Sequence, residues 1–507
     1  MLFSEKLDFL MNMMGTTNSL LAKNISVDPS FISRLRHGQR IPANFDTYVK
    51  GMAKYFSKHC PQGYQRTVLF DILKVSDRTT ESELGDCIFH WLTDAQDHEF
   101  KSIDHFLARF ASRQNSQNQM LPSIIKPQDH TPPDRETSIY YGIDGKREAV
   151  ICFLSEVLTL NQPITLLLFS DEPTDWMTSD PVFAAKWSSL MFEVLAKGNR
   201  IRIIHTISRD LDEMLNAIVQ WMPLYMSGLI DPHYYPKKRD GIFKRTLFIA
   251  PGTMAVVSTS VGSMINDAAN FLVRGVQAVA AIEQEFNHYF RLCNPLMYIY
   301  TSANQHDYMD TLYEFEKERA DGIIKTESLS LITMPESVIS SIIGRIDPLH
   351  FDLAAYFQKR IGLFEKSIKE RSFTEIIHLP DAQDVKEGRV PVAFSNILYG
   401  GAISYSAAEY ILHLENIILL LKEHSNFHIC LVTKETDAKY MVYAKEDIGV
   451  IIAKTSIPSV ILAINEENMT AAFWGFLTNT AGEKAYNKPD SEKAIKTLVD
   501  YIEVLKA

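Results

Sequence analysis

The part of the chain after residue 138 carries the same order of expected elements twice. In the first pass the apolar patterns predict a helix at 147–158, strand 164–170, helix 183–199, strand 200–208, paired strands 246–251 and 254–260, and a strand running into a helix over 276–293. The second pass gives helix 353–369, strand 373–379, helix 407–426, strand 427–433, paired strands 439–445 and 449–455, and a strand running into a helix over 459–477. A long unit present only twice predicts two similar α/β lobes and excludes a solenoid.

The chain has 507 residues, which is too long for a single hydrophobic core. The segment Arg113–Ser138 is rich in Gln, Asn, Ser and Pro and poor in large apolar residues, a composition typical of a linker. We therefore expect an all-α head joined to an α/β body. The expected boundaries are a head at 1–60, a helical connector at 61–112, the linker at 113–138, a first lobe at 139–345 and a second lobe at 346–507.

The composition, 46% hydrophobic and 22% charged, is that of a soluble globular protein. No apolar run approaches the roughly 18 residues that a membrane span needs, and the start "MLFSEKLDFL" does not resemble a secretion signal. We expect a cytoplasmic protein that does not enter a membrane. The five cysteines lie far apart, without the close Cys/His spacing of a zinc site, so we expect neither a metal nor a cofactor.

Charge is distributed unevenly along the chain. The net charge is −11, but residues 1–60 hold eight Lys/Arg against four acids, which makes the head +4 and the remainder −15. A small basic head on a large acidic body is the asymmetry expected when only the head meets phosphate.

The head contains the pattern of three short helices. A first helix is expected over 4–14 and a second over 17–25, and a third begins at Pro29 behind the N-cap residue Asp28. Within the third helix Ile32 and Leu35 face inward and Gly38 ends it. The expected outward residues are Ser30, Phe31, Ser33, Arg34 and His37. Such a face fits the major groove, where an arginine such as Arg34 bonds a guanine edge, whereas Arg36, Arg40 and Lys50 are placed to hold phosphates.

The stretch "NSLLAKNISVDPSFISRLRHGQRIP" resembles the Cro/C1-type (XRE) helix-turn-helix. The matching positions are Ala22, Val27, Ile32, Ser33, Gly38 and Pro42, and the chain departs from the pattern at Ser26, where the family usually has Gly. The resemblance implies binding to a double-stranded DNA operator. The DNA-binding residues that we expect are Asn18, Asp28, Ser30, Phe31, Ser33, Arg34, Arg36 and Arg40. The alternative is a plain three-helix bundle whose charges form a solvated face.

The body resembles the phospholipase D fold, in which two α/β lobes form a pseudo-dimer around a cleft. Active members of that family carry His-x-Lys on the first of the paired strands of each lobe. The corresponding positions here are Phe243 and Arg245 in the first lobe, and Asp437 and Lys439 in the second. No His-x-Lys occurs anywhere in the body, so the nucleophile that the family's chemistry requires is missing and we expect no enzyme.

Regulators of the TrmB family, which the architecture resembles, place a phospholipase D-like ligand sensor behind a DNA-binding head. The segment 221–245, expected as a long loop, is dense in aromatic and cationic residues, and several strand ends carry polar residues. The ligand-binding residues expected on this basis are Trp221, Tyr225, Tyr234, Tyr235, Arg245, Ser258, Thr259, Lys439, Lys454 and Thr455. The alternative is that they are ordinary core, interface or strand-end residues.

The leading hypothesis is therefore a homodimeric, DNA-binding transcriptional regulator whose inactive double lobe senses a small molecule or peptide. A second hypothesis makes the body a phosphodiesterase or nuclease that the head targets to DNA. A third makes the body a scaffold that only oligomerises. The sequence gives neither the operator, nor the effector, nor the sign of regulation.

Overall fold

The computed structural model describes residues 3–37, 45–60, 64–75, 79–112, 136–172, 175–206, 211–237, 241–262, 264, 266–301, 304–345, 353–395, 401–432, 440–456, 459–482, 486 and 489–507. The chain divides into two compact units. One unit combines residues 1–112 with 304–507, and the other comprises 113–303. The first of these units holds the helical head and the second lobe, and the other holds the first lobe. The expected linker lies outside the described residues up to 135.

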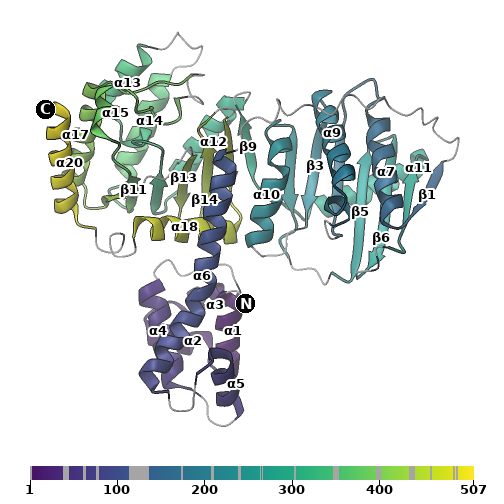
Figure 1. Ribbon diagram of the computed structural model, residues 1–507, viewed down its shortest axis with the longest axis horizontal. Helices are drawn as coiled ribbons and strands as arrows, with labels where there is room; N and C mark the ends of the chain where they lie inside the picture. The colour runs from purple at the N-terminus through teal and green to yellow at the C-terminus, as the bar shows by residue number, and fades with distance from the viewer. Residues whose placement is uncertain are drawn as a thin grey trace. The chain divides into compact units, whose positions relative to one another are not determined.

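The described part of the head consists of helices and the turns between them (Figure 1). Its helices are α1 (Phe3–Met13), α2 (Asn18–Ile25), α3 (Pro29–Arg36), α4 (Phe45–Lys58), α5 (Tyr64–Leu73) and α6 (Glu81–Ser112). Apolar side chains of all six helices share one core, with Leu7, Ile32 and Phe56 from the first four and Phe70 and Ile88 from the last two. The head therefore continues past residue 60, and the region expected as a separate connector supplies part of its core.

Helix α6 belongs to two cores. Its first turns pack within the head, whereas its C-terminal half packs against α18 (Glu467–Ala481) of the second lobe. The ring centroids of Phe106 and Phe473 are 6.0 Å apart, and those of Phe100 and Phe476 are 6.4 Å apart. The 32 residues of α6 correspond to a length of about 48 Å, enough for one helix to serve both cores.

The first lobe is a twisted sheet in the order β1-β7-β6-β5-β2-β3-β4-β8. The strands are β1 (Thr137–Tyr141), β2 (Thr165–Ser170), β3 (Arg200–His205), β4 (Ile230–Tyr234), β5 (Phe243–Ala250), β6 (Met254–Val261), β7 (Ala269–Val273) and β8 (Asn294–Pro295). Strands β2, β3 and β4 are parallel, whereas β5, β6 and β7 form an antiparallel meander. The helices are α7 (Gly142–Val157), α8 (Asp175–Thr178), α9 (Pro181–Ala196), α10 (Leu211–Tyr225) and α11 (Val276–Phe290).

Helices cover both faces of this sheet. Because neighbouring strand residues point to opposite faces, Leu247 packs with the side chains of α11 on one face, and Phe248 meets Phe153 of α7 on the other. Both faces are thus apolar, as is usual for a sheet with a parallel core. A short strand, β9 (Tyr298–Thr301), follows β8 near the end of this unit.

The second lobe repeats this design. Within residues 304–507 the strand order is β12-β11-β10-β13-β14-β15. The strands are β10 (Gly322–Lys325), β11 (Phe373–Ile377), β12 (Phe427–Leu431), β13 (Tyr440–Lys445), β14 (Gly449–Lys454) and β15 (Val460–Ile464). The helices are α12 (Gln305–Lys317), the 3-10 turn η3 (Leu331–Thr333), α13 (Glu336–Ile343), α14 (Leu353–Ser367), α15 (Ala382–Lys386), α17 (Ala407–Glu423), α18 and α20 (Ser491–Lys506). Strands β10, β11 and β12 are parallel, and β13, β14 and β15 are antiparallel.

The two sheets therefore share one topology, with β2 to β7 corresponding to β10 to β15 in order and direction. The predicted duplication of an α/β unit agrees with this arrangement, but the predicted correspondence of the first two strands is wrong by one strand. The strand at 164–170 was matched to 373–379, whereas β2 corresponds to β10 and the strand at 373–377 is β11, the counterpart of β3. The pseudo-dimer stays a prediction because it concerns the placement of one lobe against the other. The expected lobe boundary at 345/346 differs from the structure, since β10 at 322–325 pairs with β11 and β13 of the second sheet.

Two expected elements also differ. Residues 221–245 are not one long loop, because α10 extends to Tyr225 and the segment 230–234 forms β4, which pairs with β3. The segment expected as a strand running into a helix is helical from Val276, and its strand, β7, lies before it. Among the described residues no helix is long and apolar enough to cross a membrane.

Candidate functional site

The turn between α2 and α3 has the geometry that positions a recognition helix. Ser26 ends α2 in the left-handed conformation, with φ of 58°, so it takes the backbone role that glycine usually fills. Asp28 caps α3 by accepting a hydrogen bond from the Ser30 N–H at 2.7 Å, and Pro29 occupies the first helical position. A hydrogen bond from the Ser30 side chain, together with this backbone bond, lowers the pKa of the Asp28 carboxyl. Asp28 thus has a structural reason to be present, whether or not it meets DNA.

The inward face of α3 is wider than predicted. Ile32 and Leu35 are fully buried, as expected. Phe31, however, was predicted to face outward and is only 8% exposed, because its ring packs at 5.2 Å against Tyr48 of α4. The contact between Phe31 and Tyr48 depends on how α4 packs, which the pattern within α3 does not reveal, so Phe31 is corrected from a DNA contact to a core residue.

The outward face of α3 is formed by Ser30, Ser33 and Arg34. Ser30 is exposed, Ser33 is partly exposed, and the Arg34 side chain retains 43% of its exposure. The Arg34 Nε is buried without a hydrogen-bond partner among the described residues, and its Nη1 lies 4.0 Å from Asp447, a long ion pair between two half-exposed groups. The guanidinium is therefore only weakly held by the described residues.

Arg36 has a different role from the predicted one. Its Nε donates to Asp8 of α1 at 2.9 Å, and its terminal nitrogens donate to Asn18 at 3.0 Å and Asn12 at 3.1 Å. Arg36 was expected to hold a phosphate, but its guanidinium N–H groups are already used in these bonds to α1 and α2. The same bond occupies the amide oxygen of Asn18, another expected DNA contact. Arg40, Gly38 and Pro42 lie outside the described residues.

In the first lobe the expected aromatic ligand residues are packed together. Tyr225 is fully buried and its hydroxyl lies 2.6 Å from the His205 Nε2, while the Trp221 ring stands 5.6 Å from that of Trp187. Burial lowers the pKa of the His205 imidazole to about 4, so this histidine is neutral. The ring centroids of Tyr235 and Tyr289 are 5.4 Å apart with the rings tilted, and Tyr234 lies partly buried on β4. Tyr225 is corrected from a ligand contact to a buried core residue, and the partly buried Trp221 packs in the same aromatic cluster.

The polar side chains of β5 and β6 that were expected to bind a ligand point to opposite faces of the sheet. Arg245 bonds Glu285 at 2.7 Å and Thr259 at 2.9 Å on one face. Ser258 points to the other face, where it lies 3.4 Å from Glu172. Because side chains alternate along a strand, the predicted set of Arg245, Ser258 and Thr259 cannot line one site.

The face of Ser258 contains an ion pair that sequence reasoning missed. Lys146 of α7 and Glu172, both essentially inaccessible to solvent, are in direct contact, and the Lys146 Nζ donates to the Thr246 hydroxyl at 2.7 Å. The Ser260 hydroxyl donates to Glu172 at 2.9 Å. Burial lowers the pKa of the Lys146 ammonium to about 7. Lys146 stands at the start of an amphipathic helix, where a lysine is normally assigned to solvent, so the sequence carried no signal for it.

In the second lobe the expected residues Lys454 and Thr455 end β14 and are 2% and 3% exposed. The Thr455 hydroxyl donates to Glu327 at 2.5 Å, and burial lowers the pKa of the Lys454 ammonium. Lys325 of β10 donates to the Tyr440 hydroxyl at 3.2 Å. Lys439 lies outside the described residues, as does Asp437.

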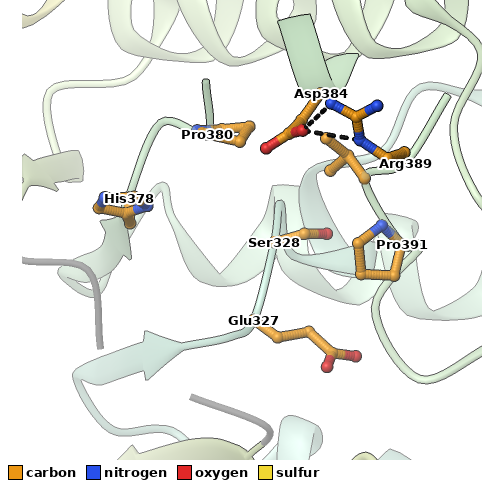
Figure 2. Close-up of a pocket in the computed structure, with 8 residues that line it drawn as sticks. Glu327, Ser328, His378, Pro380, Asp384, Arg389 and Pro391 are labelled. Carbon is orange, nitrogen blue, oxygen red and sulfur yellow. Dashed lines mark hydrogen bonds and ion pairs between the residues drawn. The ribbon is translucent and has the colours of Figure 1, made fainter. Parts of the chain in front are cut away.

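Near these residues lies a pocket of about 320 Å³ in the second lobe (Figure 2). It is lined by Glu327, Ser328, His378, Pro380, Asp384, Arg389, Val390 and Pro391. The expected ligand residue Thr455 bonds to one of these lining residues, Glu327. No group of three or more His, Cys, Asp or Glu side chains placed to hold a metal occurs in the part of the chain that the structure describes.

Comparison with known proteins gives distant structural likenesses. No family model and no curated protein matches the chain. Among solved structures, the chain is similar to TrmBL2, described as an archaeal chromatin protein with a novel mode of DNA binding, at 13% identity, a TM-score of 0.23, and coverage of 41% of this chain and 69% of that one. It is also similar to a polyphosphate kinase from Porphyromonas gingivalis, at 11% identity, a TM-score of 0.23, and coverage of 65% of this chain and 47% of that one. At these values neither likeness assigns the chain to a family.

Proposed function

We propose that this chain is a DNA-binding transcriptional regulator whose head reads an operator and whose two lobes sense a ligand or partner without catalysing a reaction. The observation that carries the proposal is the capped α3, with Ser30, Ser33 and a weakly held Arg34 on its outer face. The positive balance of the head within an acidic chain supports it. Neither β5 nor β13 carries a histidine, which favours a binding role for the lobes over phosphoryl transfer.

The proposed reader is tested by the change Arg34→Ala. The full-length protein is used to enrich binding sequences from a random duplex library, and affinity for the enriched sequence is then measured by fluorescence anisotropy. Loss of a two-pronged arginine–guanine contact corresponds to about 1–3 kcal/mol, so we expect binding to weaken by roughly 5- to 150-fold and one base position to lose its preference. An exposed arginine of the second lobe, Arg371, provides the matched control Arg371→Ala, which leaves both results unchanged.

Two results would contradict the proposal. Enrichment that yields no sequence, at any salt concentration, would leave the head without a reading role. An Arg34→Ala protein with wild-type affinity and the same base preferences would assign reading to another surface. We further propose a homodimer, which predicts an enriched sequence of two half-sites about 10 base pairs apart, whereas a single half-site with a monomer in sedimentation would exclude it.

A further inference from the structure

Strand β1 forms one edge of the sheet of the first lobe. It stands at the end of the strand order, and among the described strands its neighbour is β7 (Figure 1). The Arg274 N–H donates to the Glu136 carbonyl at 2.7 Å, and the Gly142 N–H donates to the Ala268 carbonyl at 2.9 Å. The even-numbered residues of β1 therefore bond to β7. Because bonding alternates along an antiparallel strand, the N–H and C=O groups of residues 137, 139 and 141 point away from β7, toward the edge.

This edge has none of the features that usually prevent a strand from pairing with another chain. Edge strands of soluble proteins commonly carry charged side chains or proline, whereas the sequence of β1, TSIYY, has neither. Ile139 is 50% exposed and Tyr141 is 72% exposed. Both side chains lie on the face of the sheet on which α11 packs over β2, β5 and β6. Exposed apolar side chains beside an open strand edge indicate a surface that another polypeptide covers.

The edge of β1 is complementary to its own copy. An antiparallel copy related by a two-fold axis at Ile139 places Ile139 opposite itself and Thr137 opposite Tyr141. The three outward residues of each strand then all pair, which gives about six hydrogen bonds between the two strands. The strand ends at Gly142, where a φ of 68° turns the chain into α7, so a shifted register would leave some of these residues unpaired. No like charges become opposed, since β1 carries none.

Helix α7 fits the same arrangement. It contacts both β1 and β7, so it lies above the space between these two strands. With neighbouring strands about 4.8 Å apart, a two-fold axis beside β1 brings α7 to about 10 Å from its copy, close to the roughly 8–10 Å between packed helices. Gly145 and Cys152, which both lie against Tyr140 of β1, make this side of α7 small enough for such an approach. A second copy thus covers α7 as well as β1, which a single peptide strand would not.

We propose that the first lobe binds a second copy of this chain through antiparallel pairing of β1 with β1 and packing of α7 against α7. Such pairing uses the same edge of both copies, so assembly stops at two chains. The inference names the surface of the homodimer in the proposed function and rests on that proposal only for the role of the dimer on DNA. Because association is measured without DNA, a chain that reads DNA but does not pair through β1 is distinguishable from a β1 dimer that reads no DNA.

The test uses two charged variants of the residue on the axis. Ile139→Lys and Ile139→Glu each place like charges directly opposite one another, because residue 139 faces itself. Sedimentation velocity of the full chain, over a hundredfold range of concentration, should show a dimer for wild type and a dimer dissociation constant at least tenfold higher for each variant. An equal mixture of the two variants should dimerise again, because opposite charges then meet. This rescue depends on position 139 facing its own copy, so a general loss of stability would not produce it.

The control is Val182→Lys, which places the same charge on an exposed apolar position of α9 in the same lobe and should dimerise as wild type does. The proposal is overturned if wild type is a monomer throughout, if both variants at position 139 dimerise as tightly as wild type, or if their mixture stays monomeric. Circular dichroism checks that each variant is folded.

Should the variants at position 139 fail to fold, the pair formed by Thr137 and Tyr141, both exposed, replaces them. Thr137→Glu combined with Tyr141→Glu places like charges opposite each other at both ends of the paired strands and should give a monomer. Thr137→Lys combined with Tyr141→Glu places opposite charges there and should keep the dimer. Equal association of these two proteins would overturn the proposed register.

Discussion

Arg36 and Asp8 join the third helix of the head to the first. The Nε of Arg36 donates to the Asp8 carboxylate at 2.9 Å, and the remaining donors reach Asn12 and Asn18. One guanidinium thereby connects α1, the start of α2 and the end of α3, so the orientation of the outward face of α3 depends on it. Among the described residues, Arg34, two positions earlier, has no comparable set of bonds.

We predict that Arg36→Ala destabilises the head and Arg34→Ala does not. Hydrogen bonds to charged groups contribute about 1.5–3 kcal/mol, and the partly exposed Asp8 recovers some of this from water, so we expect a loss of about 1–2 kcal/mol for Arg36→Ala. For Arg34→Ala we expect less than about 0.5 kcal/mol. Urea unfolding followed by far-UV circular dichroism measures both, and equal losses would contradict the assigned roles.

Ser26 is predicted to tolerate glycine better than a branched residue. Its φ of 58° lies in the left-handed region, which costs an L-residue about 1–2 kcal/mol. Glycine avoids this cost but loses more chain entropy on folding, so Ser26→Gly should be stabilising by about 0.5 kcal/mol. Ser26→Val should be destabilising by more than 1 kcal/mol. Thermal unfolding gives the order of the three proteins, and a valine variant as stable as the glycine variant would exclude the strained conformation.

Replacing both Lys146 and Glu172 is predicted to destabilise the protein less than replacing Lys146 alone. Removing one member of a buried pair leaves an uncompensated charge, so Lys146→Met should cost about 3–5 kcal/mol. The double change Lys146→Met with Glu172→Leu should recover most of that loss, since two apolar residues of similar size need no partner. A double-mutant cycle of unfolding free energies tests this, and additive losses would show that the two side chains do not interact.

Glu375 is predicted to make the second lobe less stable as pH rises. Burial raises the pKa of its carboxyl from 4.5 to about 7 in the folded chain. The folded state therefore holds the proton more tightly than the unfolded state, and the free energy of unfolding falls between pH 4.5 and about 7 by roughly 3 kcal/mol at most. Glu375→Gln removes this slope.

The measurement is hydrogen exchange of β11 in both proteins from pH 5 to 8, corrected for intrinsic rates. Two other titratable groups lie nearby: His413, for which burial lowers the pKa to about 3, and the buried Tyr410. Both are present in both proteins, so their effects cancel in the comparison. We expect the glutamine variant to gain protection over wild type as pH rises. A difference that does not change with pH would show that Glu375 keeps the same protonation state across the range.

The sequence was most informative where local rules decide the structure. Asp28, Pro29 and the spacing of Ile32 and Leu35 predict a capped helix from nearest neighbours alone, and the structure has it. The repeat of α/β elements was also predictable, because buried strands and amphipathic helices differ in period. The predictions were weaker for Phe31 and Arg36, whose surroundings are set by Tyr48 and Asp8, residues that are distant in sequence.

The ligand residues were harder to predict for the same reason. An aromatic-rich segment such as 221–235 is compatible with a binding loop and with a packed helix, and only the partners of Trp221 and Tyr225 distinguish them. The pocket residues Ser328 and Arg389 belong to short connections without a periodic pattern. Their shared surroundings arise from the parallel pairing of β10 with β11, which joins parts of the chain about 50 residues apart.

Helix α6 supplies side chains to the cores of both the head and the second lobe, so neither can be cut from the other without losing part of a core. Phe106 and Phe100 complete the packing around α18, while Ile88 completes the core of the head. A fragment that ends at residue 60 would lack part of the core of the head. A fragment that begins at the linker would lack the side chains that pack around α18 in the second lobe. A fragment of either the head or the second lobe would therefore have to include residues 81–112. The smallest piece of chain that keeps its own core is thus larger than the boundary between helical and α/β structure suggests.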